Sequence, residues 1–130
     1  MKNIVFFSRC DLVNLYGQLS GHISKHHKII HVAFSNNEYE ILTQNYGIEG
    51  VINFKNELQV LLAKTKLDNL VCKQIDTLII NQTSGRFNLA GAIQSDRTFQ
   101  FLSFDESRLL CQVYHEFWSN LILSHNVDYL

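Results

Sequence analysis

A short apolar run that ends abruptly in polar residues constrains the fold of this chain more than any other feature. Residues 4–7 (IVFF) show no polar alternation, which is typical of a strand covered on both faces, as in a parallel sheet. The next four residues are polar or small: Ser8, Arg9, Cys10 and Asp11. Apolar residues then recur at helical spacing, at Leu12, Leu15, Leu19 and Ile23. This order predicts a βα unit, with the turn as the wall of any ligand site, because open α/β sheets bind ligands at the carboxyl ends of strands.

A second strand and helix follow. Residues 28–34 (KIIHVAF) predict the strand. Ser35 and Glu38 form a Ser-x-x-Glu capping box, which predicts a helix that begins near Asn36. Gly47 is expected just past the end of this helix, because glycine adopts the left-handed conformation found there at little cost.

A third pair completes the pattern. Residues 50–54 (GVINF) predict a short strand, and Asn56 is expected to cap a helix that runs to about Thr65. The order is therefore βαβαβα within about 65 residues. Crossovers of this length between short apolar strands imply parallel pairing. The predicted fold class is α/β: a Rossmann-like three-layer sandwich with a short parallel sheet, followed by helices.

The second half of the chain gives a mixed pattern. Residues 75–80 fit a helix or a fourth strand, and we expect the helix. Ser103 and Glu106 form a second capping box, which opens a predicted helix at about 104–124 with a wide apolar stripe. Residues 127–130 resemble the first residues of a further strand. The sequence therefore predicts a single Rossmann-like domain over residues 1–130, as the amino-terminal part of a longer two-domain protein.

Composition excludes several classes of protein. The net charge is −1 and the pI about 6.6, so no basic field attracts nucleic acid. No apolar run approaches the roughly 20 residues of a membrane span. Arg9 and Asp11 interrupt any signal-peptide core. The three cysteines are odd in number and far apart, which favours free thiols in a reducing cytosol. We therefore expect a cytoplasmic protein.

Familiar catalytic and cofactor motifs are incomplete. No glycine-rich phosphate loop is present, and Gly17 stands alone in the first turn region. Cys10 follows the first strand as a phosphatase cysteine would, but Tyr16 occupies the position where that chemistry needs arginine, so a partly buried inert thiol is expected. His22 and His26 share a helix face without a third ligand, and cationic groups also suit a helix end. We expect neither a metal nor a cofactor.

A polar cluster in the second half has two interpretations. Its residues are Arg86, Asn88, Asp96 and Arg97. Two guanidinium groups, a carboxylate and an amide form many directed hydrogen bonds. They would either line a polar cleft or form an ion-pair and capping network that orders a loop, and both interpretations stay open.

Two blocks of sequence resemble one family. Residues 4–17 (IVFFSRCDLVNLYG) are similar to the amino-terminal strand and turn of bacterial capsule and surface-polysaccharide biosynthesis proteins. The second block resembles the Asp-Arg segment and aromatic helix of the same proteins, in residues 85–89 (GRFNL), 93–99 (IQSDRTF), 102–107 (LSFDES) and 114–118 (YHEFW). Those proteins are glycosyltransferase-like, of the two-domain GT-B type.

The resemblance implies a function for this part of the protein. The amino-terminal domain would hold a saccharide or lipid-linked saccharide acceptor, and a carboxyl-terminal domain beyond Leu130 would hold the nucleotide sugar. Peripheral association with the inner face of the membrane would follow. The motif places cleft-lining roles on Ser8, Arg9, Asp11, Tyr16 and Gly17, and rim roles on Arg86, Asn88, Asp96 and Arg97.

Chemical roles follow from residue types. Asp11 is our candidate general base for an acceptor hydroxyl, and Arg9 or Arg97 would stabilise phosphate charge. Catalysis by residues 1–130 alone is not expected. The alternative is a non-enzymatic binding or interaction domain of flavodoxin-like shape.

Overall fold

The structure, a computed structural model, describes residues 1–66 and 101–130. The expected helix at 75–80 lies outside the described residues, as do Arg86, Asn88, Asp96 and Arg97. The chain divides into two compact units. The first comprises Met1–Val60 with Phe117–Leu130, and the second is Leu61–Glu116.

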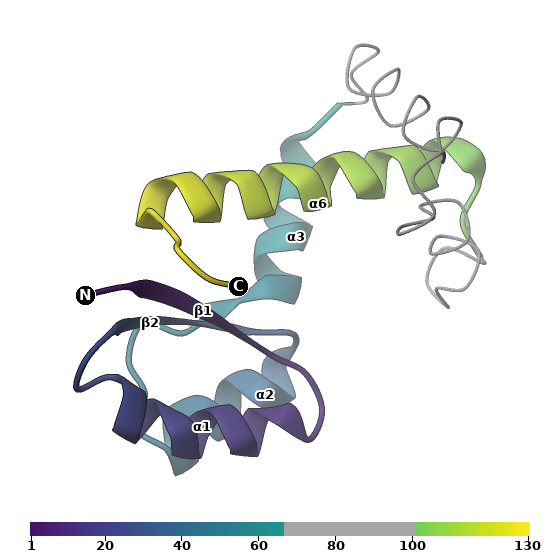
Figure 1. The fold of residues 1–130 in the computed structure, drawn as a ribbon. Helices are drawn as coiled ribbons and strands as arrows, with labels where there is room; N and C mark the ends of the chain where they lie inside the picture. Colours follow the sequence, from purple (N-terminus) through teal and green to yellow (C-terminus); the bar gives the residue numbers. More distant parts are fainter. Residues whose placement is uncertain (67–100) are drawn as a thin grey trace, which may run out of the picture. The chain divides into compact units, whose positions relative to one another are not determined.

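A parallel sheet forms the centre of the first unit (Figure 1). Its strands are β1 (Asn3–Ser8), β2 (Lys28–Ala33) and β3 (Ile52–Asn53), in the order β1-β2-β3. Both pairings are parallel, and Ser8 is opposite Ala33 at the carboxyl end. The parallel α/β prediction is confirmed, although β3 is shorter than the five residues expected.

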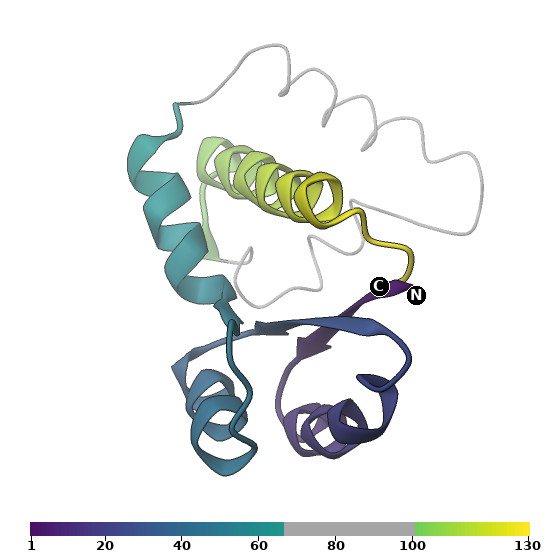
Figure 2. The same cartoon turned by 90° about the vertical axis from the view of Figure 1, so that its left-hand side faces the viewer.

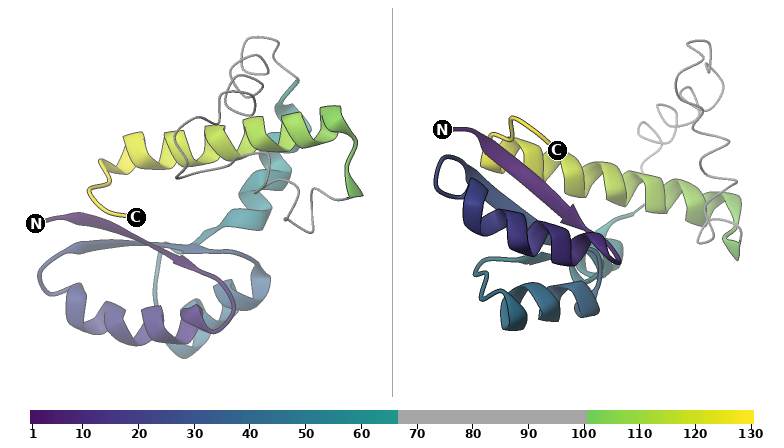
Figure 3. Two further views of the ribbon diagram at one scale, coloured as in Figure 1. Left: turned by 45° about the vertical axis from the view of Figure 1, so that its right-hand side comes forward. Right: turned by 60° about the horizontal axis from the view of Figure 1, so that its bottom comes forward.

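The end of the chain adds a further strand-like segment to this sheet. Ile4 forms a parallel bridge with Tyr129, and the Val5 amide donates to the Tyr129 carbonyl at 2.8 Å. A strand has two edges and β2 occupies one of them, so Tyr129 lies on the other edge of β1. Both chain termini therefore lie beside β1 (Figure 3). Of the expected strand start at residues 127–130, Tyr129 alone pairs with β1, as a single bridge.

Helices cover both faces of the sheet in the first unit (Figure 2). One face carries α1 (Leu12–Ile23) and α2 (Asn36–Glu40), which continues into the π-helical turn η1 (Ile41–Asn45). The opposite face carries the first part of α3 (Phe54–Lys64) and the last part of α6 (Phe104–His125). These layers are those of a small Rossmann-like α/β fold.

The two faces have different cores. Under α1 and α2 the core contains the aliphatic residues Val13, Ala33 and Leu42, and the Phe6 ring stacks on the Tyr16 ring of α1. Successive residues of β1 point to opposite sides of the sheet, so Phe7 faces the other side. The core on that side is aromatic. There the ring of Phe7 lies 5.3 Å from that of Phe54 and 5.1 Å from that of Trp118. Burial of both faces explains why residues 4–7 are apolar without alternation.

The buried face of α1 is not the one that the leucines predict. Leu12 and Leu15 keep 45% and 48% of their surface exposed, whereas Val13 and Gly17 are buried. Both sets recur at helical spacing, so periodicity does not distinguish them. Close approach of the Tyr46 ring to Gly17 fits the face that carries the small residue.

Local signals give most helix ends correctly. Gly47 has φ +62°, as expected after the end of η1. The cap of α3 differs, because the Asn56 amide donates to Asn53 Oδ1 at 3.2 Å. Asn53 therefore caps α3, which begins at Phe54, slightly earlier than expected.

The second unit contains the end of α3 and the beginning of α6. The Ser103 amide donates to Glu106 Oε2 at 2.7 Å, and the Glu106 amide donates to Ser103 Oγ at 3.2 Å. This reciprocal pair is the predicted capping box. Gln112 Nε2 donates to the Lys66 carbonyl at 3.1 Å, which joins α6 to the residues after α3 within this unit.

Candidate functional site

The strand order identifies one edge of the first unit as the candidate site. The chain moves from β1 to β2 to β3, and then returns with Tyr129 on the opposite side of β1. This reversal makes β1 a topological switch point. In open α/β sheets, ligands bind outside the carboxyl ends of the strands at such a point. The turn after Ser8 therefore lies at the edge where a ligand site is expected.

Glu38 organises this edge. Its carboxylate accepts a hydrogen bond from the Cys10 amide at 3.1 Å, and from both the amide (3.0 Å) and the hydroxyl of Ser35. Only 5% of Glu38 is exposed. One carboxylate thus joins the turn after β1 to the turn after β2, in addition to closing the capping box predicted at the start of α2.

The hydrogen bonds determine the charge state of Glu38. Burial acts to raise the pKa of this carboxyl, but hydrogen bonds from the Ser35 hydroxyl and from nearby backbone amides outweigh it, so the pKa lies below its ordinary value. The Cys10 amide therefore donates its hydrogen bond to an ionised carboxylate. This turn therefore does not offer the Cys10 amide to a phosphate group, and any anion at this edge depends on the Arg9 side chain instead.

Two predicted site residues, Arg9 and Asp11, lie exposed at this edge, with the exposed Cys10 between them. The Arg9 guanidinium lies 4.6 Å from the centre of the Phe34 ring, within cation–π distance. Cys10 has φ +51°, a conformation that few non-glycine residues adopt, and it is exposed rather than partly buried. Asp11 stands at the start of α1, where its side chain makes no capping hydrogen bond.

The other predicted residues of the first turn lie inside the packing between α1 and the sheet. Ser8 is fully buried, and its hydroxyl has no hydrogen-bond partner within residues 1–66 and 101–130. The Tyr16 ring stacks on Phe6 at 4.6 Å. Gly17 lies against the Tyr46 ring. Packing accounts for Tyr16 and Gly17, and their roles toward a substrate stay predictions.

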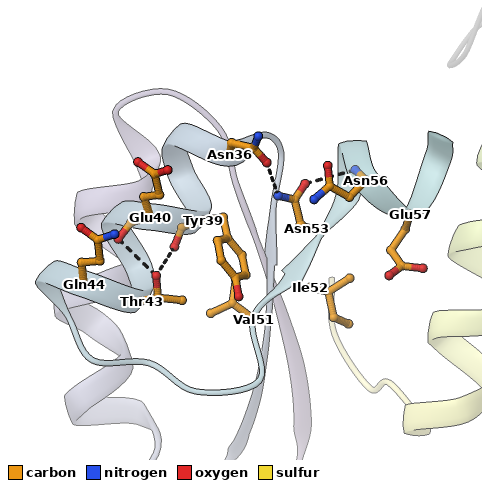
Figure 4. Close-up of a pocket in the computed structure, with 10 residues that line it drawn as sticks. All are labelled: Asn36, Tyr39, Glu40, Thr43, Gln44, Val51, Ile52, Asn53, Asn56 and Glu57. Atoms are coloured by element: carbon orange, nitrogen blue, oxygen red, sulfur yellow. Dashed lines mark hydrogen bonds between the residues drawn. The ribbon is translucent and has the colours of Figure 1, made fainter. Parts of the chain in front are cut away.

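A hollow of about 670 Å³ opens beside β3, wholly within the first unit (Figure 4). None of the predicted site residues lines it. It is bordered by α2, η1, β3 and the first turn of α3, and its lining residues are Asn36, Tyr39, Glu40, Thr43, Gln44, Val51, Ile52, Asn53, Asn56 and Glu57.

Three asparagines form a row along this hollow (Figure 4). Asn53 Nδ2 donates to Asn36 Oδ1 at 2.6 Å, and Asn53 Oδ1 accepts from the Asn56 amide at 3.2 Å. Asn36 follows β2 and Asn53 ends β3, so the row lies at the carboxyl edge of the sheet. The signal in the sequence was an asparagine at the end of one of these strands and shortly after the end of the other.

Other site classes find no support in the described parts of the chain. Residues 1–66 and 101–130 contain no group of three or more His, Cys, Asp or Glu side chains that would hold a metal ion. None of the described helices combines the length and apolar character that a membrane crossing requires.

Comparisons of the chain with models of protein families, with curated proteins and with solved structures find no match. The class of protein therefore rests on the fold and the site. They define a small α/β domain with a parallel sheet, a switch point at β1 and a polar carboxyl edge.

Proposed function

We propose that residues 1–130 form the acceptor-side domain of a glycosyltransferase in capsular or surface-polysaccharide biosynthesis. One observation carries the proposal: Arg9 and Asp11 stand exposed immediately after β1, the strand at which the order of the strands reverses. The resemblance of residues 4–17 to surface-polysaccharide enzymes supplies the reaction class.

The proposed chemistry uses these two side chains. The Asp11 carboxylate accepts the proton of an acceptor hydroxyl as that oxygen bonds to the anomeric carbon of a nucleotide sugar. The bond from that carbon to the nucleoside diphosphate breaks, and the negative charge stays on the leaving phosphate. Arg9 stabilises that charge through its planar set of N–H donors. The donor sugar is held by a further domain, so this domain alone does not complete the reaction.

The proposal defines partners and location. The acceptor is a saccharide or a lipid-linked saccharide, and nucleic acid is not a partner. A lipid-linked acceptor places the protein in the cytoplasm at the inner face of the membrane. These assignments come from the resemblance and from the near-neutral net charge of −1.

The Asp11→Asn variant tests the proposal, with the substitution introduced into the natural gene in the cell. General-base catalysis contributes roughly 100-fold to 10,000-fold, so we expect sugar transfer to an acceptor to fall by at least about 100-fold. Glu49→Gln is the matched control, because Glu49 is an exposed carboxylate away from the carboxyl edge. Transfer that survives Asp11→Asn would contradict the proposed role.

One observation favours the alternative, a non-enzymatic flavodoxin-like interaction domain. Leu12 and Leu15 form an exposed apolar surface on α1 beside the candidate site. Under this alternative the wild-type protein transfers no sugar. A Leu12→Gln, Leu15→Gln double variant would then weaken cross-linking to its partner in cells, whereas Asp11→Asn would not.

A further inference from the structure

We propose that the hollow beside β3 binds an uncharged saccharide. The hollow lies between α2, η1, β3 and the start of α3, next to β3 rather than at the β1 switch point. The inference goes beyond the proposed function, because binding here requires neither Asp11 nor transfer. It rests on the chemistry of the lining, the fixed geometry of the amides, the aromatic ring and the charge.

The lining is chemically suited to hydroxyl groups. Of its ten residues only Val51 and Ile52 are apolar, so eight carry polar groups. The polar set combines amides, carboxylates and hydroxyls. A sugar hydroxyl donates one hydrogen bond and accepts others, so it needs donors and acceptors close together.

Two side-chain amides of the row, those of Asn36 and Asn53, are hydrogen-bonded to each other without a ligand. Both polar atoms of the Asn53 side chain are hydrogen-bonded: Nδ2 donates to Asn36 Oδ1, and Oδ1 accepts from the backbone amide of Asn56 in α3. Among the hydrogen bonds of the described residues, Asn36 uses its oxygen and keeps its N–H donors, while Asn53 keeps one N–H donor. Ordered donors reduce the entropy that binding costs. The row therefore offers several N–H groups in set positions to ring hydroxyls.

Tyr39 supplies the remaining element of a sugar site. Its ring lines the hollow and is 37% exposed (Figure 4). An aromatic face gives apolar surface to the C–H groups of a pyranose, and the phenol adds a polar edge. The volume of about 670 Å³ lies within the roughly 300–1,000 Å³ typical of small-molecule sites.

The charge of the lining disfavours anionic ligands. Glu40 and Glu57 line the hollow, and no lysine or arginine does. Phosphate and nucleotide groups would meet negative charge without a compensating cation. A metal ion is disfavoured because the described residues contain no group of three or more His, Cys, Asp or Glu ligands. An amine remains the strongest competitor, and the experiment includes one.

The experiment titrates the ¹⁵N-labelled 130-residue chain with sugars and follows its amide resonances. Glucose, galactose and N-acetylglucosamine are the neutral probes, at up to about 50 mM to detect millimolar affinity. Glucosamine, with its amine protonated, and glucuronate carry opposite charges on the same ring. We expect a neutral probe to shift the side-chain amides of Asn36 and Asn53. Glucuronate should bind at least about fivefold more weakly because of like-charge repulsion.

Matched variants identify the binding surface. Asn36→Ala and Gln44→Ala should each weaken binding about fivefold to tenfold, as expected for one lost hydrogen bond. Asn37→Ala, on the same helix as Asn36, and Gln59→Ala, on α3, are the controls, because both residues are exposed and lie outside the hollow. Asn36→Ala also removes the hydrogen bond to Asn53, so this variant could unfold. If it does, the affinity of Gln44→Ala alone tests the binding surface.

Three results would overturn the inference. They are no shift with any neutral probe, shifts that map outside the hollow, and binding of glucosamine alone. Equal affinity in Gln44→Ala and Gln59→Ala would also overturn it. Because the measurement involves no transfer, each of these results would leave the proposed function to its own test.

Discussion

Glu38 is a single side chain on which two turns of the candidate site depend. Its oxygens accept hydrogen bonds from Cys10 and Ser35, and the side chain is buried. Hydrogen bonds to an ionised group are worth more than those between neutral groups. The order of the exposed Arg9–Asp11 turn therefore depends on a residue that does not itself face the solvent.

Glu38→Gln should lower the free energy of unfolding by about 1.5–3 kcal/mol at neutral pH, because the amide replaces one acceptor oxygen with a donor. The pKa of Glu38 is lower in the folded protein than in the unfolded chain, so the unfolded chain binds more protons. The stability from this carboxylate is present above its ordinary value of 4.5 and is lost as the pH falls through the folded pKa. Urea unfolding at a series of pH values measures both effects.

The difference between wild type and variant isolates Glu38 from other acid effects. Burial lowers the pKa of His31, so stability from its neutral form is lost as the pH falls below 6.5, in both proteins. Glu49→Gln controls for removal of an exposed carboxylate. An identical acid profile for Glu38→Gln and wild type would refute the role of Glu38.

At the scale of the element, α1 is placed on the sheet by its smallest residue. A Cβ at Gly17 would lie 2.5 Å from Tyr46 Cδ2 and 2.7 Å from Cγ, which is too close for a side chain. The Tyr46 hydroxyl also donates to Asn14 Oδ1 at 3.0 Å, so the ring is held on α1 at two points. Helix and ring can approach this closely only because residue 17 has no side chain.

Gly17→Ala and Gly21→Ala form a matched pair in one helix. Alanine gains about 1 kcal/mol in helix propensity at either position. Nothing lies within 4 Å of a Cβ at Gly21, so Gly21→Ala should raise stability by about 0.5–1 kcal/mol. At Gly17 overpacking costs about 1–3 kcal/mol, so Gly17→Ala should be neutral to destabilising by up to about 2 kcal/mol. Denaturant unfolding measures both values, and an equal gain in the two variants would contradict the packing.

At the scale of the whole molecule, the first unit joins the beginning of the chain to its last residues. Asn3 Nδ2 donates to the carbonyls of His125 at 2.8 Å and Asn126 at 3.1 Å, and the Asn3 amide donates to Asp128. Lys2 and Asp128 add an exposed ion pair at 3.0 Å, which contributes little by itself. These contacts hold Tyr129 beside β1 and thereby create the switch point.

Asn3→Ala should release this closure. Loss of two side-chain hydrogen bonds should cost about 1–2 kcal/mol in unfolding free energy. Hydrogen exchange of the Val5 amide, which donates to Tyr129, should accelerate, while amides within α1 should exchange nearly as before. Asn37→Ala is the control, because it removes an exposed amide elsewhere. Unchanged exchange at Val5 would show that Asn3 does not hold the closing segment.

The sequence by itself determined the features that depend on neighbouring residues. Both capping boxes, Ser35 with Glu38 and Ser103 with Glu106, form as predicted, because their hydrogen bonds join residues three apart. Residues 4–7 are apolar on both faces, and this indicated a parallel sheet covered on two sides. The exposed turn of Arg9 and Asp11 followed from the same pattern.

Only the tertiary structure decided which of several equally periodic faces is buried and which distant residues meet. Leu12 and Val13 both fit a helical repeat, and contact with Tyr46 at Gly17 favours the face of Val13. The reach of Glu38 to Cys10, the side of β1 on which Tyr129 pairs, and the hollow beside β3 join residues far apart in the chain. Such contacts depend on packing in three dimensions, and local hydrogen bonding and periodicity carry no record of it.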